Sequence, residues 1–279
     1  MRRSPLAALL LVFAVIWPAA AQEREQIVKL PGPGGATLVT NVLRPAGDAR
    51  RPLVVINHGS PADDSQRAKM VPPRYSSLSS WFLAQGYVVA LPLRRGYGET
   101  GGAWAEGYGS CSSPDYFSAG LHGAADIRAT IDFMRTQPYV APDRTLVVGQ
   151  SAGGWATVAL SSLNPPGVPA MVNFAGGRGG HQRLPGGGLG NCTPEALVQA
   201  AGKYGATARV PMLWIYTEND SFFEPSLARR MFEAYNAAGG KGTYRPLGAF
   251  GSDGHNLAGS DNGVAMWQGP VSEFLATLR

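Results

Sequence analysis

The stretch VVGQSAGGW at residues 147–155 decides the fold class, because an apolar, β-branched run leads directly into a serine flanked by glycines. The small and polar residues of the GQSAG segment contribute little to a packed apolar core. Its glycines allow a tight turn and let neighbouring backbone approach closely. We therefore expect a strand, a sharp bend that presents Ser151, and a helix that starts at the bend.

Apolar strands alternate with helical segments along the rest of the chain. The expected strands are 37–43, 53–57, 87–93, 145–148, 170–174, 212–216 and 243–247, and the expected helices are 75–85, 119–136, 151–163, 225–238 and 264–278. Strands that are apolar throughout are buried on both faces. The pattern predicts an α/β fold with a mostly parallel central sheet, helices on both faces, and a ligand site at the carboxyl ends of the strands.

The N-terminal segment has the composition of a secretory signal peptide. A basic start at residues 2–3 precedes an apolar run at 6–17 and small residues at 19–21. This run is short for a membrane span. We expect a signal peptide at 1–21, one domain at 22–279, and a periplasmic or secreted protein. No other long apolar run occurs, so no membrane span is expected in the mature chain.

Charge and cysteine content narrow the functional classes. The formal charge of +5 falls by two, to +3, when the signal peptide is removed. That balance is mild and no Lys/Arg block stands out, so no nucleic-acid partner is predicted. Cys111 and Cys192 form an even pair, which in an exported chain predicts a disulfide. Without an HExxH motif or clustered His and acidic ligands, neither a metal nor a cofactor is expected.

A serine hydroxyl is a weak nucleophile and needs a base that is oriented by an acid. In proteins with a strand–serine–helix elbow, the chain order is serine, acid, histidine. His255 is the only histidine beyond residue 181, and it lies in the polar loop GSDGHN after the last expected strand. It is therefore the predicted base for Ser151.

The acid is predicted to follow the strand at 212–216. Asp220 is the first choice, because it falls several residues past the strand end with a helix following. Glu218 is the second choice and Glu224 the third. Asp253 stands beside the histidine but comes too late in the expected order.

Two backbone amides should stabilise the oxyanion that forms during acyl transfer. The first is the amide of Ala152, directly after the nucleophile, and the second belongs to the loop after strand 53–57. Pro61 has no N–H, so Ser60 is the predicted second donor. His58, at the strand end, is expected to have a structural hydrogen-bonding role.

Taken together, these segments resemble the α/β-hydrolase superfamily, and most closely its dienelactone-hydrolase and prolyl-oligopeptidase-type esterase branches. The resemblance is carried by NHGSP (57–61), RRGYGETGG (94–102), GQSAGG (149–154), YTENDSFF (216–223) and DGH (253–255). It implies that Ser151 is the nucleophile, Asp220 the acid and His255 the base, with Ser60 and Ala152 as oxyanion donors. Dienelactone hydrolases usually carry a cysteine nucleophile, so lactone specificity is not implied. The chain has no room for the β-propeller of prolyl-oligopeptidase-type peptidases.

Two long irregular segments, 98–118 and 176–193, are expected on the active-site side. Each contains one of the cysteines, so the predicted disulfide would tie them together as a partial lid beside Ser151. Arg178 and Arg183 are expected to be solvated loop charges, with a substrate carboxylate as the alternative partner. The residues that could line an apolar or aromatic pocket are Trp104, Tyr108, Phe222 and Phe223.

The sequence thus predicts an exported serine hydrolase that cleaves carboxylic esters of small molecules through an acyl-enzyme. A peptidase or amidase with the same residues is the nearest alternative. A non-catalytic binding protein that has kept the fold is the alternative from another class.

Overall fold

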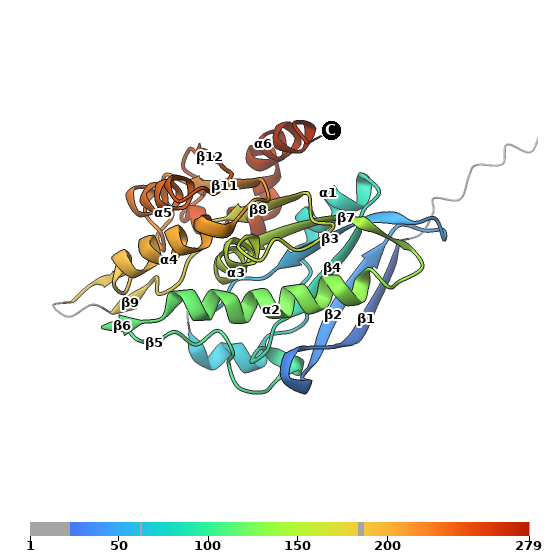
Figure 1. Ribbon diagram of the computed structural model, residues 1–279, viewed down its shortest axis with the longest axis horizontal. Helices are drawn as coiled ribbons and strands as arrows, with labels where there is room; N and C mark the ends of the chain where they lie inside the picture. Colours follow the sequence, from blue (N-terminus) through green and yellow to red (C-terminus); the bar gives the residue numbers. More distant parts are fainter. Residues whose placement is uncertain (1–22, 62, 184–186, 279) are drawn as a thin grey trace, which may run out of the picture.

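One mixed sheet of eight strands forms the centre of the molecule, in the order β1-β2-β4-β3-β7-β8-β11-β12 (Figure 1). The structure, a computed structural model, describes residues 23–61, 63–183 and 187–278. The expected signal peptide at 1–21 lies outside the described residues. The strands of this sheet are β1 (Arg24–Pro31), β2 (Thr37–Arg44), β3 (Arg51–Asn57), β4 (Val88–Leu93), β7 (Val140–Gln150), β8 (Ala170–Phe174), β11 (Met212–Thr217) and β12 (Gly242–Leu247).

Most of the sheet is parallel, as predicted. Strand β2 runs antiparallel to both of its neighbours, β1 and β4. All pairs from β4 to β12 are parallel. The carboxyl ends of β3, β4, β7, β8, β11 and β12 therefore open onto the same edge of the sheet, and this is the edge where ligand sites form in such folds.

The central strands are buried on both faces because their side chains alternate between two apolar clusters. In β3, Leu53 and Val55 belong to one cluster, and Val54 and Ile56 belong to the other. Strands β4, β7, β8 and β11 divide in the same way. A period of two in a continuous apolar run is what a strand covered by helices on both sides requires.

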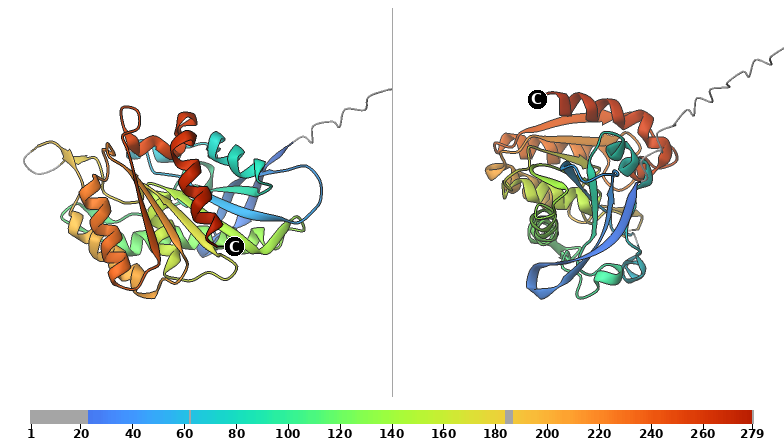
Figure 2. Two further views of the ribbon diagram at one scale, coloured as in Figure 1. Left: turned by 90° about the horizontal axis from the view of Figure 1, so that it is seen from above. Right: turned by 90° about the vertical axis from the view of Figure 1, so that its right-hand side faces the viewer.

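Helices cover both faces of the sheet (Figure 2). Buried residues of α2, α3, α4 and α5 join the first cluster, and those of α1 and α6 join the second. The helices are α1 (Ser76–Ala84), α2 (Tyr116–Met134), α3 (Ala152–Ser161), α4 (Pro194–Thr207), α5 (Pro225–Ala237) and α6 (Val264–Ala276). Short 3-10 helices are η1 (Pro33–Gly35), η2 (Asp64–Lys69), η3 (Gly98–Thr100), η4 (Gly254–Gly259) and η5 (Asp261–Gly263).

One strand of the central sheet and one of the α-helices are not among the expected elements. Strand β1 is polar and largely exposed at the sheet edge, so it lacks an apolar signal. Helix α4 contains Gly202 and Gly205, which weaken its helical signal. Gly205 is needed because a Cβ there would collide with the backbone of Tyr235 in α5, so the glycine lets the two helices approach closely.

The two segments expected to be irregular each contain a short hairpin. The first includes β5 (Gly109–Ser110) and β6 (Ser113–Pro114), and the second includes β9 (Gln182–Arg183) and β10 (Leu189–Gly190). A disulfide between Cys111 and Cys192 joins the segments, as the sequence predicts. The first segment is shorter than expected, because α2 already begins at Tyr116. Over the described part of the chain, every helix is too short or too polar to cross a bilayer.

The disulfide should contribute measurably to stability. It closes a sequence separation of 81 residues, and the chain-entropy model assigns about 4.5 kcal/mol to a loop of this size. We expect Cys111→Ser/Cys192→Ser to lower the free energy of unfolding in urea by that order. Reductant should lower the free energy of unfolding of the wild type by the same amount, whereas it should leave that of the variant unchanged. Alkylation of both cysteines in unreduced, denatured wild type would contradict the bond.

Candidate active site

The serine sits in a strained backbone bend between β7 and α3. Ser151 has φ 54° and ψ −120°, a left-handed conformation that non-glycine residues rarely adopt. The flanking glycines make the bend possible. A Cβ at Gly149 would collide with the carbonyl of Gly153, and a Cβ at Gly153 would collide with the carbonyls of Asn57 and His58. The bend is also tied to β8 and its following loop, because Ser151 N donates to Phe174 O over 3.0 Å and Gly177 N donates to Ser151 O over 3.3 Å.

The structure brings Ser151, His255 and Asp220 together in one hydrogen-bonded line. His255 Nε2 lies 2.9 Å from Ser151 Oγ, and His255 Nδ1 lies 3.0 and 3.2 Å from the two carboxylate oxygens of Asp220. Because a carboxylate only accepts, Nδ1 carries the hydrogen and Nε2 is free to accept from the serine hydroxyl. All three side chains are buried.

The Asp220 carboxylate is held by its own loop. Its Oδ1 accepts from the backbone N–H groups of Phe222 over 2.9 Å and Phe223 over 3.0 Å. The two alternatives lie elsewhere: Glu218 and Glu224 are exposed. The geometry therefore favours Asp220, the first choice of the sequence analysis, as the partner of the histidine.

Asp253 orients the histidine loop without touching the imidazole. Its Oδ1 accepts from His255 N over 3.0 Å and from Ser221 N over 3.1 Å, and its Oδ2 accepts from Ser221 Oγ over 2.6 Å. On the other side, Gln150 Nε2 donates to His255 O over 3.1 Å. The loop after β12 is thereby fastened both to the β11 loop and to the residue before the serine.

The His255 ring is also part of an aromatic stack that the sequence did not reveal. Phe222 lies against it with ring centroids 4.1 Å apart and planes inclined by 21°. His181 stacks on Phe222 at 3.7 Å and 14°, and its Nε2 lies 2.8 Å from Ser221 Oγ. Two rings stacked this closely must occupy opposite faces of Phe222. The phenyl ring is therefore clamped between two imidazoles, which limits the rotation of His255.

Of the amides in the loop after β3, Ser60 is the one left for an oxyanion. Gly59 N donates to the hydroxyl of Tyr75 over 3.1 Å, and that hydroxyl donates to Gln150 Oε1 over 3.1 Å. Pro61 has no N–H. Ser60 and Ala152 line the same cavity as Ser151. Within the described chain, neither of their amides donates to a protein group.

His58 takes the structural role that its position predicts. Its Nε2 accepts from Arg94 N over 3.3 Å, so its Nδ1 donates to Gly59 O over 2.7 Å. Burial, together with the positive charge of Arg94, lowers the pKa of His58 to about 3. The ring is therefore neutral at ordinary pH and fixes the loop that carries Ser60.

A buried ion cluster, which no sequence pattern indicates, lies beside the cavity at Ser151. Glu106 Oε1 accepts from Arg94 Nε, and Glu106 Oε2 accepts from Arg178 Nη2 and, over 3.1 Å, from Tyr97 OH. Burial alone would raise the pKa of Glu106, but the two guanidinium groups lower it to about 2. The expectation that Arg178 is a solvated loop charge is wrong: its side chain is 4% exposed. The reason is Glu106, which reaches it from the segment after β4, 72 residues away in sequence. Arg183 is exposed on β9, as expected.

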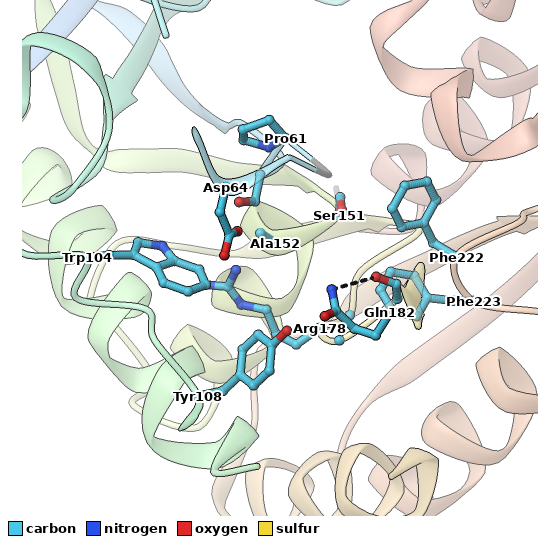
Figure 3. A pocket seen from close by; sticks show the side chains of 14 residues that line it. Pro61, Asp64, Trp104, Tyr108, Ser151, Ala152, Arg178, Gln182, Phe222 and Phe223 are labelled. Atoms are coloured by element: carbon cyan, nitrogen blue, oxygen red, sulfur yellow. Dashed lines mark hydrogen bonds between the residues drawn. The ribbon is translucent and has the colours of Figure 1, made fainter. Parts of the chain in front are cut away.

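Two cavities meet at Ser151. The smaller, of about 50 Å³, we call the Arg178 cavity. The larger, of about 730 Å³, we call the His255 cavity. Trp104 and Tyr108 lie on one side of the Arg178 cavity and Phe222 and Phe223 on the other (Figure 3). Arg178 lies between them, and Ser151 and Ala152 lie above it in this view. The His255 cavity is lined by Met70, Val71, Pro73, Tyr75, His255 and Asn256, among others. All four expected pocket residues thus line the smaller cavity.

Comparisons with known proteins identify the fold and the family. The model of the X-Pro dipeptidyl-peptidase (S15) family matches residues 34–206. Among solved structures, a Klebsiella pneumoniae protein assigned as a dienelactone hydrolase superposes over 91% of this chain and 99% of its own, with TM-score 0.57 and 16% identity. The Pyrococcus furiosus esterase Pf2001 covers 91% of this chain and 92% of its own, with TM-score 0.63 and 14% identity.

A puromycin-hydrolyzing peptidase from Mycobacterium tuberculosis is similar over a smaller part of its length. It covers 95% of this chain but only 42% of its own, with TM-score 0.65 and 17% identity. A comparison with curated proteins gave no match. These structural similarities show the α/β-hydrolase fold, and esterases and peptidases both occur among the similar structures.

The two buried groups near the site predict how stability depends on pH. The unfolded chain binds a proton at His58 below about pH 6.5, whereas the folded chain does so only near pH 3. Stability is therefore lost as the pH falls through this window, by about 1.4 kcal/mol per pH unit from His58. Glu106, whose folded pKa is lowered, adds a further loss as the pH falls below about 4.5.

Urea unfolding followed by tryptophan fluorescence between pH 7.5 and pH 4.5 measures this slope. His58→Gln should flatten this slope, because the glutamine amide can still donate and accept hydrogen bonds but does not titrate. Asp143→Asn, at an exposed carboxylate remote from the serine, is the control and should keep the wild-type slope. Equal slopes for wild type and His58→Gln would contradict the assignment.

Proposed function

The chain belongs to the X-Pro dipeptidyl-peptidase (S15) family of the α/β-hydrolase superfamily, and on this premise we propose that it is an exported serine hydrolase that cleaves carboxylic esters. One observation carries the proposal: Asp220, His255 and Ser151 form a continuous hydrogen-bonded line that ends at a serine held in a strained elbow. This is the arrangement that nucleophilic acyl transfer requires.

In the first half of the reaction, Ser151 Oγ attacks the ester carbonyl while His255 Nε2 takes its proton. Asp220 keeps the imidazole oriented and stabilises its positive charge. The amides of Ser60 and Ala152 hold the developing oxyanion, and the start of α3 adds its positive dipole end. His255 then passes the proton to the alcohol oxygen, which leaves, and the acyl group stays on Ser151.

In the second half, a water molecule takes the place of the alcohol. His255 removes its proton, the oxygen attacks the acyl carbonyl, and the bond to Ser151 breaks with the proton returned to the serine. The net change is ester plus water to acid plus alcohol. This reaction needs only Ser151, His255 and Asp220, the two oxyanion amides and the residues that line the pocket.

A peptidase or amidase on the same residues is the second candidate, and the family description and the similar peptidase favour it. An enzyme that removes dipeptides must bind a free N-terminal ammonium, which needs an available carboxylate. Asp64 lines the Arg178 cavity but pairs with Arg67, and Glu106 is held by two arginines. Among the described residues that line the cavities at Ser151, no carboxylate is free to bind an ammonium group, and this supports the ester proposal.

We infer that the enzyme works in the periplasm or outside the cell. The basic, apolar and small-residue order of residues 2–21 supports a signal peptide. The Cys111–Cys192 disulfide supports an oxidising compartment.

The first test is covalent labelling with a fluorophosphonate probe, followed by mass mapping of the adduct. We expect the adduct on Ser151, and none on Ser151→Ala. A folded wild type that takes up no label and hydrolyses no ester would favour the non-catalytic binding protein instead.

The second test compares ester with amide substrates, and then compares variants of two acidic side chains. We expect turnover of 4-nitrophenyl esters to exceed that of Ala-Pro-4-nitroanilide, and the reverse would favour the peptidase.

Asp220→Asn should lower kcat/KM by about 10⁴-fold. Glu218→Gln, an exposed carboxylate of the same loop, is the matched control and should stay within about twofold.

A further inference from the structure

The positions of the two cavities distinguish the acyl side of the site from the alcohol side; this step rests on the proposed function. The leaving alcohol takes its proton from His255 Nε2, so it must lie on the side of that ring. His255 and Asn256 line the larger cavity but not the Arg178 cavity. Ala152, the first oxyanion donor, lines the Arg178 cavity. The acyl group therefore occupies the small cavity and the alcohol the large one.

The small cavity suits a short acyl group better than a bulky one. Its volume is about 50 Å³, and a single water needs about 10–15 Å³ on the same measure. A chain of a few heavy atoms fits. The larger cavity, at about 730 Å³, includes Met70 and Val71 and can take a bulky, apolar alcohol.

Arg178 gives the small cavity an excess of positive charge. Arg94, Glu106 and Arg178 together contain two guanidinium groups and one carboxylate, so the carboxylate balances only one of them. The other charged pair at the cavity cancels: Asp64 binds Arg67, whose guanidinium lies 3.8 Å from the ring centre of Trp104.

The hydrogen bonds of Arg178 are incomplete. Its Nη2 donates to Glu106, but its Nε is buried without a partner among the described residues. Buried donors are nearly always satisfied, and an unpaired buried guanidinium N–H is costly. The side chain lines the cavity, and its neighbour Gly177 donates directly to the backbone of Ser151. A ligand group in this cavity therefore lies beside both Ser151 and the Arg178 side chain.

We propose that the substrate is a hemiester of a short dicarboxylic acid, with its free carboxylate bound by Arg178 and its alcohol in the His255 cavity. A carboxylate matches the planar fork of a guanidinium and neutralises the excess charge. Glu106 acts as the positioning residue, because it fixes the guanidinium from the side away from the ligand. Arg178 is thus the specificity-determining residue, and a neutral acyl chain would leave its donors unpaired.

The test compares monobenzyl glutarate with benzyl valerate, which has the same acyl length but no carboxylate, by measuring benzyl alcohol release. We expect wild type to prefer the hemiester in kcat/KM by at least tenfold. Arg178→Gln should lower the ratio of the two kcat/KM values by about 100-fold, mainly through KM for the hemiester. Arg183→Gln, an exposed arginine of the same segment, is the matched control and should keep the wild-type ratio.

A second readout does not depend on turnover or on the stability of Arg178→Gln. Glutarate should bind to the Ser151→Ala variant in calorimetry, and Arg178→Lys, which keeps the charge but loses the fork, should weaken this binding at least tenfold in the same background. A wild type that prefers benzyl valerate, or glutarate binding that Arg178→Lys leaves unchanged, overturns the proposal. If Ser151 is labelled and benzyl valerate is cleaved, that failure concerns Arg178 alone. The absence of both would overturn the proposed function itself.

Discussion

The left-handed bend at Ser151 is the constraint on which the rest of the structure depends. It exists only because Gly153 lets α3 approach the end of β3, where any side chain would strike the carbonyls of Asn57 and His58. The same close approach determines where the loop after β3 can run. The hydroxyl of Tyr75 then links that loop to Gln150, one residue before the serine. The serine and the amide of Ser60 are thus positioned by one backbone contact and one hydroxyl, which is how a rigid site can be built from loops.

The Arg178 side of the site is held instead by contacts between residues far apart in the sequence. The segments after β4 and β8 are joined near the serine by Glu106 and Arg178, and farther out by the disulfide between Cys111 and Cys192. Burying three charges is expensive, and well-packed apolar residues often stabilise a fold as much. The position of the cluster at the edge of a cavity therefore fits a role in ligand binding better than a role in stability. Arg178 thus contacts Glu106 inside the protein and also lines the cavity at Ser151.

Most of the fold could be predicted from the sequence because its strands are continuous apolar runs ended by glycines and polar turns. Runs such as LVVIN and VVALPL must be buried on both faces, and this alone implies a covered, mainly parallel sheet. Strand β1 could not be predicted because an edge strand needs no apolar face, and α4 could not because its glycines serve contact with α5 rather than helix propensity.

Some residues of the candidate site could be predicted from the sequence and others could not. Ser151, Asp220 and His255 could be predicted because each follows a strand in a fixed order, so topology alone brings them together. The pairing of Glu106 with Arg178 could not, because each is an ordinary charged loop residue until the chain folds. The stacking of Phe222 between two imidazoles could not be predicted either, since His181 comes from a segment without a regular sequence pattern.

The unequal cavities on either side of Ser151 also determine the order of events in the proposed reaction. In that reaction the alcohol would depart through the larger cavity, while the acyl group would stay in the smaller one. Any acceptor that reaches the acyl-enzyme must then enter by the route the alcohol has just left. Water and a second alcohol would compete for the same opening beside His255. In the proposed reaction, the supply of alcohols around the protein would then decide whether the acyl group is hydrolysed or transferred to a new alcohol oxygen.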